Sequence, residues 1–434
     1  MHKLSMKNFG PIKSCELEVN ELVLLTGAQA SGKSTVAKTI YFFKTVKDDI
    51  LNLMLLSSDE NNQRTKWKMR LSRTLRLKFL QLFGSSHPMS ENLRLIYKYA
   101  EKTAIEVTLI FDRYTNRKDF IEIKYSEDIE NYLSDLDQKG FENISDRQLA
   151  YEKETLNDLF DDEKTSIFVP AGRSMITLLT SQLNYIFVSM EDSQRRNIDY
   201  CTQRYIELIL KLKPLFSEGL KEMVNKKRNT SGDKLSSGLL TRMQEIIRTV
   251  LKGNYRYSDG EERLYFEGSR YVKINYTSSG QQEIVWMLNL LFYYVLENKK
   301  VFLILEEPES HLYPDAQKSI SELIALFKNY GNDVLLTTHS PYMLGAFNNL
   351  LLSHQVGSPS KEDCEAVKKI VDRRAWIDPK ELSAYHTESG KIKSALDEEA
   401  ALIDNALIDG ISNVINEDSD ALLNISFRKE AQGE

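Results

Sequence analysis

The sequence lacks long apolar runs and any export signal. No stretch approaches the roughly 18 uninterrupted apolar residues that a membrane-spanning helix needs. The N-terminal residues MHKLSMKNFG contain no apolar core of the kind found in secretory signal peptides. Both absences predict a cytoplasmic protein without a membrane-spanning segment.

The sequence also has few cysteines and no excess of positive charge. Cys15, Cys201 and Cys364, the three cysteines among 434 residues, are far apart and match no metal-binding spacing. We therefore expect free thiols in a reducing cytosol. Lys and Arg number 57 against 63 Asp and Glu, which gives a formal net charge of −6. This balance does not indicate a generally basic nucleic-acid binder, although it leaves a local basic patch open.

Two kinds of hydrophobic periodicity divide the chain. Alternating apolar residues predict strands near the N-terminus, a hairpin at 104–125 and further strands at 254–276. Beyond residue 280, the apolar strands VFLILE and DVLLTT alternate with helices, which predicts a parallel sheet covered by helices. The fold class is therefore α/β with a mixed sheet. We expect four segments, namely a lobe at 1–173 with an antiparallel β part and a basic helix at 62–82, a helical insertion at 174–253, a second lobe at 254–354 and a helical, acidic extension at 355–434.

A glycine-rich loop follows the predicted strand ELVLLTG. Its residues are Gly27, Ala28, Gln29, Ala30, Ser31, Gly32, Lys33, Ser34 and Thr35. They match the P-loop pattern G-x-x-x-x-G-K-[ST], with a strand before and a helix after, which makes a chance glycine loop the weaker alternative. Backbone N–H groups of such a loop point at phosphate oxygens. We expect Lys33 to reach the β- and γ-phosphates of ATP and the Ser34 hydroxyl to bind Mg²⁺.

Two carboxylates end the apolar strand VFLILE. Parallel strands end at the sheet edge that binds ligands. We expect Glu306 to hold Mg²⁺, through a water molecule, and Glu307 to orient or deprotonate the water that attacks the γ-phosphate. Without the P-loop, two solvated acids at a strand end would be the better interpretation.

Two further segments have residues that suit phosphate binding. The strand DVLLTT ends beside His339, which we expect to lie next to Glu307 and to hydrogen-bond the γ-phosphate; a purely structural histidine is the alternative. The segment TSSGQQ, with Ser278, Ser279, Gly280 and Gln281, precedes a long helix. Small residues at a helix start expose N–H groups to an anion, although an ordinary helix cap has the same appearance.

The P-loop, TSSGQQ, the strand that ends in Glu306 and Glu307 and the strand that ends at His339 stand in this order along the chain. Together they resemble the ABC-type ATPase superfamily, and within it the SMC, RecF and OLD-like branch. EEPESHLYP is similar to the EEPEAHLHP form of OLD-like ATPases, THSPYML to the switch-histidine segment, and the opening NFGPIK also fits. TSSGQQ stands where the family has its LSGGQ-like signature. Ser278, Gly280 and Gln281 match, whereas Ser279 replaces a glycine and Thr277 an apolar residue. We call residues 277–282 the signature segment.

The resemblance implies an ABC-type P-loop NTPase head and a shared catalytic site. In the family, two heads dock head-to-tail, so Ser278 in the signature segment of one copy contacts the γ-phosphate of the ATP held by Lys33 of the other. A single P-loop and a single signature imply a second copy or a related chain, in a dimer or a larger homo-oligomer. The segment FVPAGRS, with Arg173, is a candidate for the neighbourhood of the family's metal-proximal glutamine.

The C-terminal residues bear on the function that the resemblance implies. Many OLD-like ATPases continue into a Toprim nuclease, but no strand followed by paired D-x-D acids stands after residue 355. The chain therefore resembles standalone AAA_15-like ATPases of bacterial antiphage systems such as Septu and PARIS, which imply a regulatory ATPase and a separate effector, for example a nuclease. The alternatives are a DNA-repair or chromosome-associated ATPase and, least favoured because of the long insertions, a transporter motor.

A basic stretch at 63–78, QRTKWKMRLSRTLRLK, carries seven Lys or Arg and no acid. Trp67, Leu71 and Leu75 share one helical face. DNA or RNA could lie along this helix with Trp67 stacking on a base, or an acidic partner could bind it. We favour a solvated helix whose apolar stripe packs inward.

Overall fold

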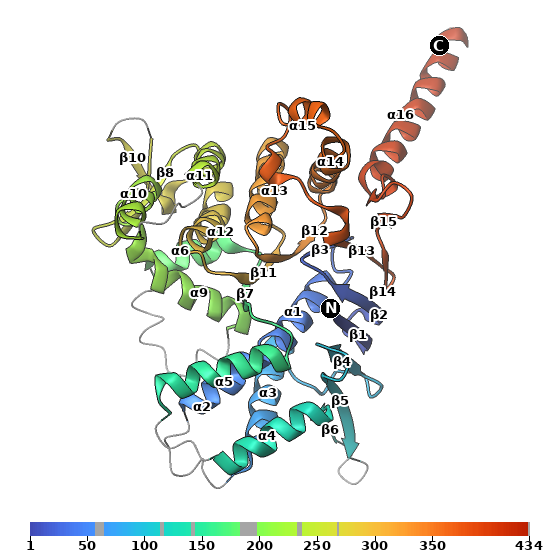
Figure 1. Cartoon of the computed structure of the whole chain (residues 1–434). Coiled ribbons are helices and arrows are strands. Elements are labelled where there is room, and N and C mark those ends of the chain that lie inside the picture. The colour runs from blue at the N-terminus through green and yellow to red at the C-terminus, as the bar shows by residue number, and fades with distance from the viewer. Residues whose placement is uncertain are drawn as a thin grey trace.

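The computed structural model describes residues 1–56, 65–112, 117–139, 144–182, 198–231, 237–266 and 269–432. Within these ranges the chain is organised around one 11-stranded sheet of the order β6-β5-β4-β1-β2-β14-β13-β3-β12-β11-β7. Figure 1 shows helices on both faces of this sheet and the C-terminal helix projecting away from it. The mixed α/β sheet predicted from the sequence is confirmed.

Five strands form the parallel half of the sheet. They are β7 (Thr165–Val169), β11 (Val301–Glu306), β12 (Asp333–Thr338), β3 (Leu22–Gly27) and β13 (Leu382–Glu388). Every residue of β3 and β11 is buried, because helices cover both faces. Leu22 and Leu24 pack into one core while Val23 and Leu25 pack into the other. The carboxyl ends of these strands therefore meet at one edge.

The sheet separates two hydrophobic cores, and helices cover each of them. On one face lies α1 (Lys33–Lys44), which begins directly after the P-loop. The other face carries α12 (Ser279–Leu296), α13 (Pro314–Asn329) and α14 (Pro341–Gly357). The predicted alternation of strands and helices beyond residue 280 is confirmed.

The other half of the sheet is mainly antiparallel and contains β14 (Lys391–Ser394), β2 (Ile12–Val19), β1 (His2–Phe9), β4 (Arg94–Lys98), β5 (Ala104–Asp112) and β6 (Arg117–Tyr125). Strand β14 joins the two halves, since it pairs antiparallel with β13 and parallel with β2. The predicted hairpin at 104–125 is present, although residues 113–116 of its turn lie outside the described residues. Four helices accompany this half, α2 (Val46–Leu55), α3 (Trp67–Phe83), α4 (Glu127–Lys139) and α5 (Asp146–Leu159).

The region between β7 and α12 is helical and then forms a small sheet. It contains α6 (Arg173–Gln182), α9 (Tyr200–Leu212), the 3-10 helix η1 (Lys213–Phe216), α10 (Leu220–Ser231), α11 (Ser237–Leu251), β8 (Asn254–Ser258), β9 (Glu261–Tyr265), β10 (Tyr271–Lys273) and the 3-10 helix η2 (Ile274–Tyr276). The buried Glu262 holds this region together, since it pairs with Lys213 at 2.6 Å and accepts a hydrogen bond from Trp286. The polar residues from Asn225 onwards continue α10 as far as Ser231.

The segment after residue 355 is only partly helical, so the expected helical extension is wrong for its middle. It contains α15 (Lys361–Val367), η3 (Arg373–Ala375), η4 (Pro379–Glu381), the strands β13 and β14, the short pair β15 (Leu396–Asp397) and β16 (Leu402–Ile403), and α16 (Ala406–Gln432). Strand β13 pairs with the P-loop strand β3 and belongs to the central sheet. Its partners lie about 360 residues away (Leu382 opposite Leu22), so local periodicity gave little signal.

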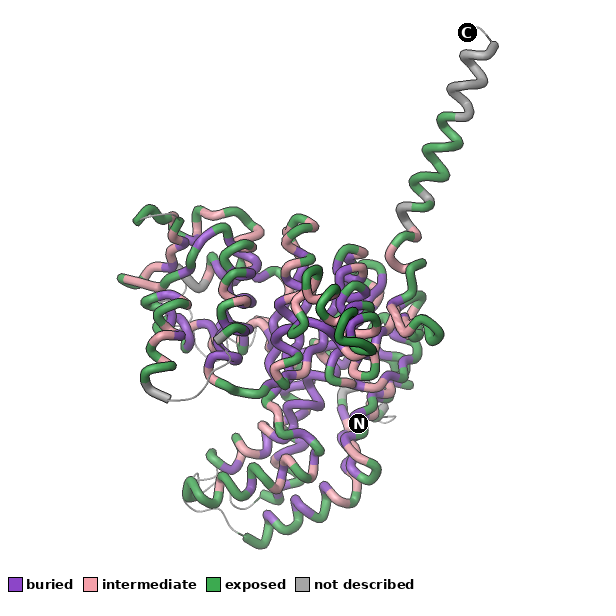
Figure 2. Tube along the Cα trace, turned by 45° about the horizontal axis from the view of Figure 1, so that its top comes forward, coloured by how far each residue is buried: buried purple, intermediate pink, exposed green. Residues whose placement is uncertain are grey.

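Figure 2 shows that α16 leaves the body of the molecule; its first turns are partly buried, and its described residues from 413 to 423 are exposed. None of the helices within the described ranges is both long and apolar enough to span a membrane.

Candidate nucleotide-binding site

The P-loop joins β3 to α1 in a conformation that requires glycine. Gly27 and Gly32 have φ values of 146° and 106°. A Cβ on Gly27 would lie 2.2 Å from Thr387 Oγ1, and one on Gly32 would lie 2.5 Å from Ile12 Cδ1. Neither position therefore tolerates a side chain. Residues 28–30 between them are exposed, so their backbone is open to a ligand.

Lys33 lies folded into this loop. Only 5% of the residue is exposed, and its Nζ donates hydrogen bonds to Gly27 O at 2.7 Å and Ala28 O at 2.8 Å. Burial lowers the pKa of Lys33, while the carboxylates of Glu307 and Glu309 act in the opposite sense. The ammonium group is thus held between the loop and the acidic strand end.

Glu306 brings a buried carboxylate to the end of β11. One oxygen, Oε2, accepts a hydrogen bond from Ala171 N at 3.3 Å, and the other, Oε1, is buried without a hydrogen-bond partner in the described part of the chain. Burial raises the pKa of Glu306, whereas the neighbouring Ser34 and Lys38 lower it. An unsatisfied carboxylate oxygen beside a serine hydroxyl is a fitting pair of hard ligands for Mg²⁺.

Glu307 and His339 lie side by side on neighbouring strand ends. Parallel pairing sets Glu306 opposite Thr337, and Glu307 N donates to Thr337 O at 3.0 Å. Glu307 has a φ of 43°, an uncommon value for a residue with a side chain. The distance from His339 Nδ1 to Glu307 Oε1 is 3.7 Å. Both side chains are accessible, so the structure brings them together as the sequence predicted.

Two site residues were missed by the sequence analysis. Glu309 is buried and accepts hydrogen bonds from Thr338 Oγ1 at 2.6 Å and His339 N at 3.0 Å, which ties the loop after β11 to the end of β12. Thr387 of β13 donates to Thr26 O at 3.1 Å, and Ser31 Oγ lies 2.5 Å from its hydroxyl. The fourth position of EEPE was visible as a motif residue, whereas nothing in the sequence marked Thr387.

Arg173 has a different environment from the one expected. Its side chain is fully buried, and its guanidinium donates to Pro170 O at 2.9 Å, Glu306 O at 2.6 Å and Glu307 O at 2.9 Å. It also lies 3.3 Å from the buried carboxylate of Glu283 in α12. The segment FVPAGRS does adjoin Glu306, but the Arg173 guanidinium is engaged with the backbone. Arg173 therefore links the acidic strand end to the first turns of the signature helix.

The signature segment forms the start of α12. Ser278 is the N-cap residue and makes a capping box with Gln281, whose side chain also donates to Leu251 O at 2.7 Å. A Cβ on Gly280 would lie 2.6 Å from His311 O, so the helix start packs closely on the loop that follows β11. Ser278 and Ser279 are exposed. Ser278 and Gln281 therefore do cap α12, as the helix-cap interpretation expected. The capped end of the helix is nevertheless exposed to solvent.

The basic helix α3 does not present an aromatic side chain to a nucleic acid. Trp67 is 5% exposed, and Leu71 and Leu75 are buried beside it. The proposed stacking of Trp67 on a base is therefore wrong, because its ring packs inward with the apolar stripe. Lys78 is also buried and pairs with Asp49 at 2.5 Å. The inward-packing interpretation of this helix is confirmed.

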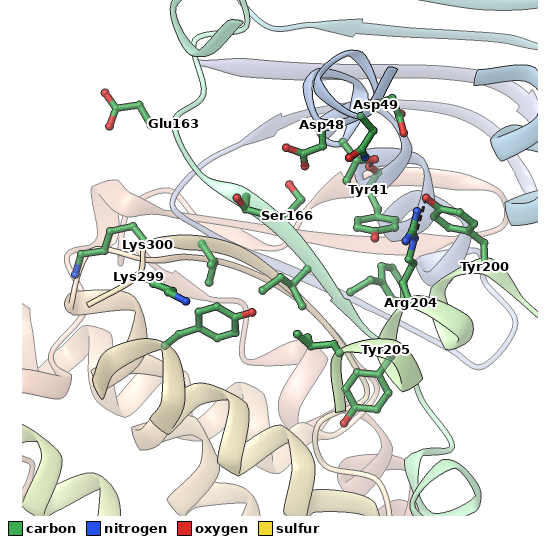
Figure 3. Close-up of a pocket in the computed structure, with 18 of the residues that line it drawn as sticks. Tyr41, Asp48, Asp49, Glu163, Ser166, Tyr200, Arg204, Tyr205, Lys299 and Lys300 are labelled. Carbon is green, nitrogen blue, oxygen red and sulfur yellow. Dashed lines mark hydrogen bonds between the residues drawn. The ribbon is translucent and has the colours of Figure 1, made fainter. Parts of the chain in front are cut away.

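A separate cavity of about 630 Å³ lies at the opposite, amino-terminal ends of the parallel strands. It is lined by Thr165 and Ser166 at the start of β7, by Asp48 of α2 and by side chains of α9. Figure 3 shows Arg204 of α9 hydrogen-bonded to Tyr200 in its wall. Because the P-loop opens at the carboxyl ends, this cavity is not part of the site formed by Lys33, Glu306, Glu307 and His339.

The chain is similar in fold to several solved structures of SMC head domains. Solved structures similar to the chain include an SMC head bound to the C-winged helix domain of ScpA (12% identity, TM-score 0.40, covering 92% of this chain and 98% of that chain). An SMC head domain from Thermotoga maritima (12%, 0.36, 90% and 97%) and one derived from Pyrococcus furiosus, with an extended coiled coil and bound to the C-terminal domain of ScpA (11%, 0.36, 91% and 96%), are also similar. No curated protein sequence matches the chain significantly.

The family comparison covers every site residue that was predicted from the sequence. Residues 1–344 match the family AAA_15, described as an AAA ATPase domain. This range contains the P-loop, the signature segment, both carboxylates of the strand end and His339, and it spans well over half of the chain. The chain therefore belongs to the AAA_15 family of AAA ATPase domains.

Proposed function

We propose that the chain binds ATP with Mg²⁺ at its P-loop and hydrolyses it in composite sites formed by two copies of itself. The observation that carries the proposal is the convergence of Lys33, Glu306, Glu307 and His339 at the carboxyl ends of three adjacent parallel strands. Ligands of α/β sheets bind at this edge. A buried cation, a buried acid and two accessible polar side chains together suit a triphosphate.

Each residue has a role that its position supports. Lys33 exchanges its two loop carbonyls for the β- and γ-phosphates, and Ser34 with Glu306 holds Mg²⁺, which when bound offsets the charge of the phosphates. Glu307 accepts a hydrogen bond from the attacking water and orients it. His339 donates to the γ-phosphate, and Glu309 acts as a positioning residue because it anchors the His339 backbone at 3.0 Å.

The second half of each composite site is the signature segment of another copy. Its Ser278 and Ser279 are exposed at the N-terminus of α12, an 18-residue helix whose backbone dipole favours an anion. Arg173 and Glu283 connect this helix start to Glu306 and Glu307 of the same chain. A phosphate of the other copy that binds the signature segment is therefore connected, through Arg173 and Glu283, to Glu306 and Glu307 in the chain's own ATP site.

The wider role follows from the resemblance to standalone ATPases of antiphage systems. On that analogy the chain is a regulatory ATPase that controls a separate effector, such as a nuclease. It would work in the cytosol, where its three free cysteines suit a reducing compartment. A direct role on DNA is less favoured, because the aromatic side chain of the basic helix is buried.

Mixing two inactive variants tests the composite site. Lys33→Ala removes the P-loop cation, and Ser278→Arg places a long side chain at the signature segment. Each variant alone should show no ATP turnover. In a 1:1 mixture, half of the dimers are mixed and each has one complete site, so roughly a quarter of the wild-type turnover should return if subunits exchange and sites act independently.

A matched control separates this effect from the loss of a helix cap. Ser360 is an exposed N-cap at α15, far along the chain from the site, so Ser360→Arg should leave turnover unchanged. Full hydrolysis by isolated Ser278→Arg would overturn the trans-acting model. Normal ATP affinity in Lys33→Ala would remove the P-loop from the mechanism.

A further inference from the structure

Helix α16 presents an apolar stripe that continues from the core into solvent. Ile408 packs against the core beside Gly345 of α14. Ile415 and Leu422 follow at seven-residue spacing, so they share the same helical face. They are 57% and 67% exposed. Large apolar side chains exposed along one face of a helix mark an interaction surface, so we expect a partner surface to cover this stripe.

Acidic residues surround this stripe. Leu423, which is 53% exposed, widens the stripe on one side. Asp418 lies beside Ile415 and Leu422, Asp420 lies beyond Leu423 on the other side, and both acids are exposed. The sequence has no Lys or Arg between residues 394 and 427. The partner surface should therefore combine exposed apolar side chains with positive charge.

The outer face of α3 has these two properties. Lys66 precedes the helix, and Met69, Arg73, Leu77 and Leu80 follow at spacings of three and four residues, so all five lie on one side. All five are exposed, Leu77 to 54%. Helix α3 contains no acidic residue.

The surface beside α3 extends the apolar patch. Leu55 and Leu56, at the end of α2, are also exposed. Together with Leu77 and Leu80 they line a groove of about 1090 Å³. Scattered single apolar residues are common on protein surfaces, but a contiguous group with a groove marks an interaction site.

We propose that α16 of one copy docks on the outer face of α3 in a second copy of the chain. The apolar stripe would cover Leu77 and Leu80, and Asp418 and Asp420 would meet Lys66 and Arg73. The two helices cannot pair within one chain, because Figure 1 places α16 and α3 at opposite ends of the molecule.

This contact would differ from the composite ATP site. It joins two unlike surfaces, α16 and α3, so it closes into a pair when two copies exchange their helices about a two-fold axis and otherwise builds rings or longer assemblies. It uses neither the P-loop nor the signature segment, so it should form without nucleotide. The proposal stands independently of the proposed ATPase mechanism.

Charge reversal tests the contact in the nucleotide-free, full-length protein. Asp418→Lys/Asp420→Lys makes α16 basic, and Lys66→Glu/Arg73→Glu makes α3 acidic. In sedimentation velocity, each double variant should associate at least about tenfold more weakly than the wild type, since like charges then face each other. When the two variants are mixed, both kinds of contact become complementary again, and association should return.

The control carries the same charge change elsewhere. Glu398 and Glu399 are exposed just before α16, so Glu398→Lys/Glu399→Lys should associate like the wild type. In a second measurement, Leu77→Cys and Leu422→Cys on separate copies should form a disulfide between chains upon mild oxidation. A wild-type chain that sediments as a monomer at every concentration, or a mixture of the reversed variants that fails to associate, would overturn the proposal.

Discussion

Removal of the Arg173 guanidinium should destabilise the fold and impair catalysis together. The Arg173→Met variant keeps the bulk of the side chain but loses four hydrogen bonds to backbone carbonyls, from Nε to Glu283 O and from the two Nη atoms to Pro170, Glu306 and Glu307. It also loses the ion pair with Glu283, in which both side chains are fully buried.

The loss of stability in Arg173→Met depends on the hydrogen bonds that Glu283 keeps. Glu283 still accepts backbone N–H groups from Arg173 at 2.9 Å and Ser174 at 2.6 Å, so its carboxylate keeps part of its stabilisation. Removing one partner of a buried ion pair costs about 3–5 kcal/mol. We expect a loss near the middle of that range, about 4 kcal/mol. ATP turnover should fall more than ATP affinity, because Glu306 and Glu307 lose a backbone anchor whereas the P-loop does not.

Urea unfolding followed by circular dichroism measures the loss in free energy of unfolding, and steady-state hydrolysis measures the loss of ATP turnover. A matched control is Arg374→Met, because Arg374 pairs with Asp372 at the surface. That variant should cost less than about 1 kcal/mol. Adding Glu283→Gln to Arg173→Met should cost less than the sum of the single effects, since the unpaired charge disappears. If Arg173→Met unfolded within about 1 kcal/mol of the wild type, the proposed linkage would be refuted.

Three further outcomes are expected. Glu307→Gln should bind ATP without turning it over and accumulate as an ATP-bound assembly in light scattering; sustained hydrolysis would exclude Glu307 as the residue that activates water. Thr387→Val should weaken ATP binding about fivefold in calorimetry, because the Ser31 contact is lost at a cost of about 1 kcal/mol; unchanged affinity would show that β13 does not shape the loop. Burial lowers the pKa of His2 to about 4, so between pH 6.5 and 4 the unfolded chain binds a proton that the folded chain does not. Lowering the pH from 7 to 5 should therefore cost the wild type about 2 kcal/mol of stability from this group. His2→Gln should lack this component, and parallel pH profiles for the two proteins would contradict the assignment.

The local parts of the site were predictable from the sequence. The turn at Gly27 and Gly32 needs backbone angles that glycine adopts readily, so a short pattern is enough to recognise the P-loop. Glu306 and Glu307 end the apolar run of β11, His339 follows the largely apolar strand β12, and parallel strands end at one edge. The inward stripe of α3 was likewise visible, since Trp67 and Leu71 recur at helical spacing.

Only the tertiary structure decided which distant segments complete the site. Strand β13 pairs with β3 across about 360 residues, and its short mixture of polar and apolar residues becomes a strand because a place beside β3 is available. Thr387 therefore reaches the P-loop, although nothing nearby in the sequence marks it. Arg173 was recognised as notable, but its role depends on three strand and helix ends meeting around one buried guanidinium. Local conformational preferences act over a few residues, whereas burial and pairing depend on which surfaces the folded chain brings into contact.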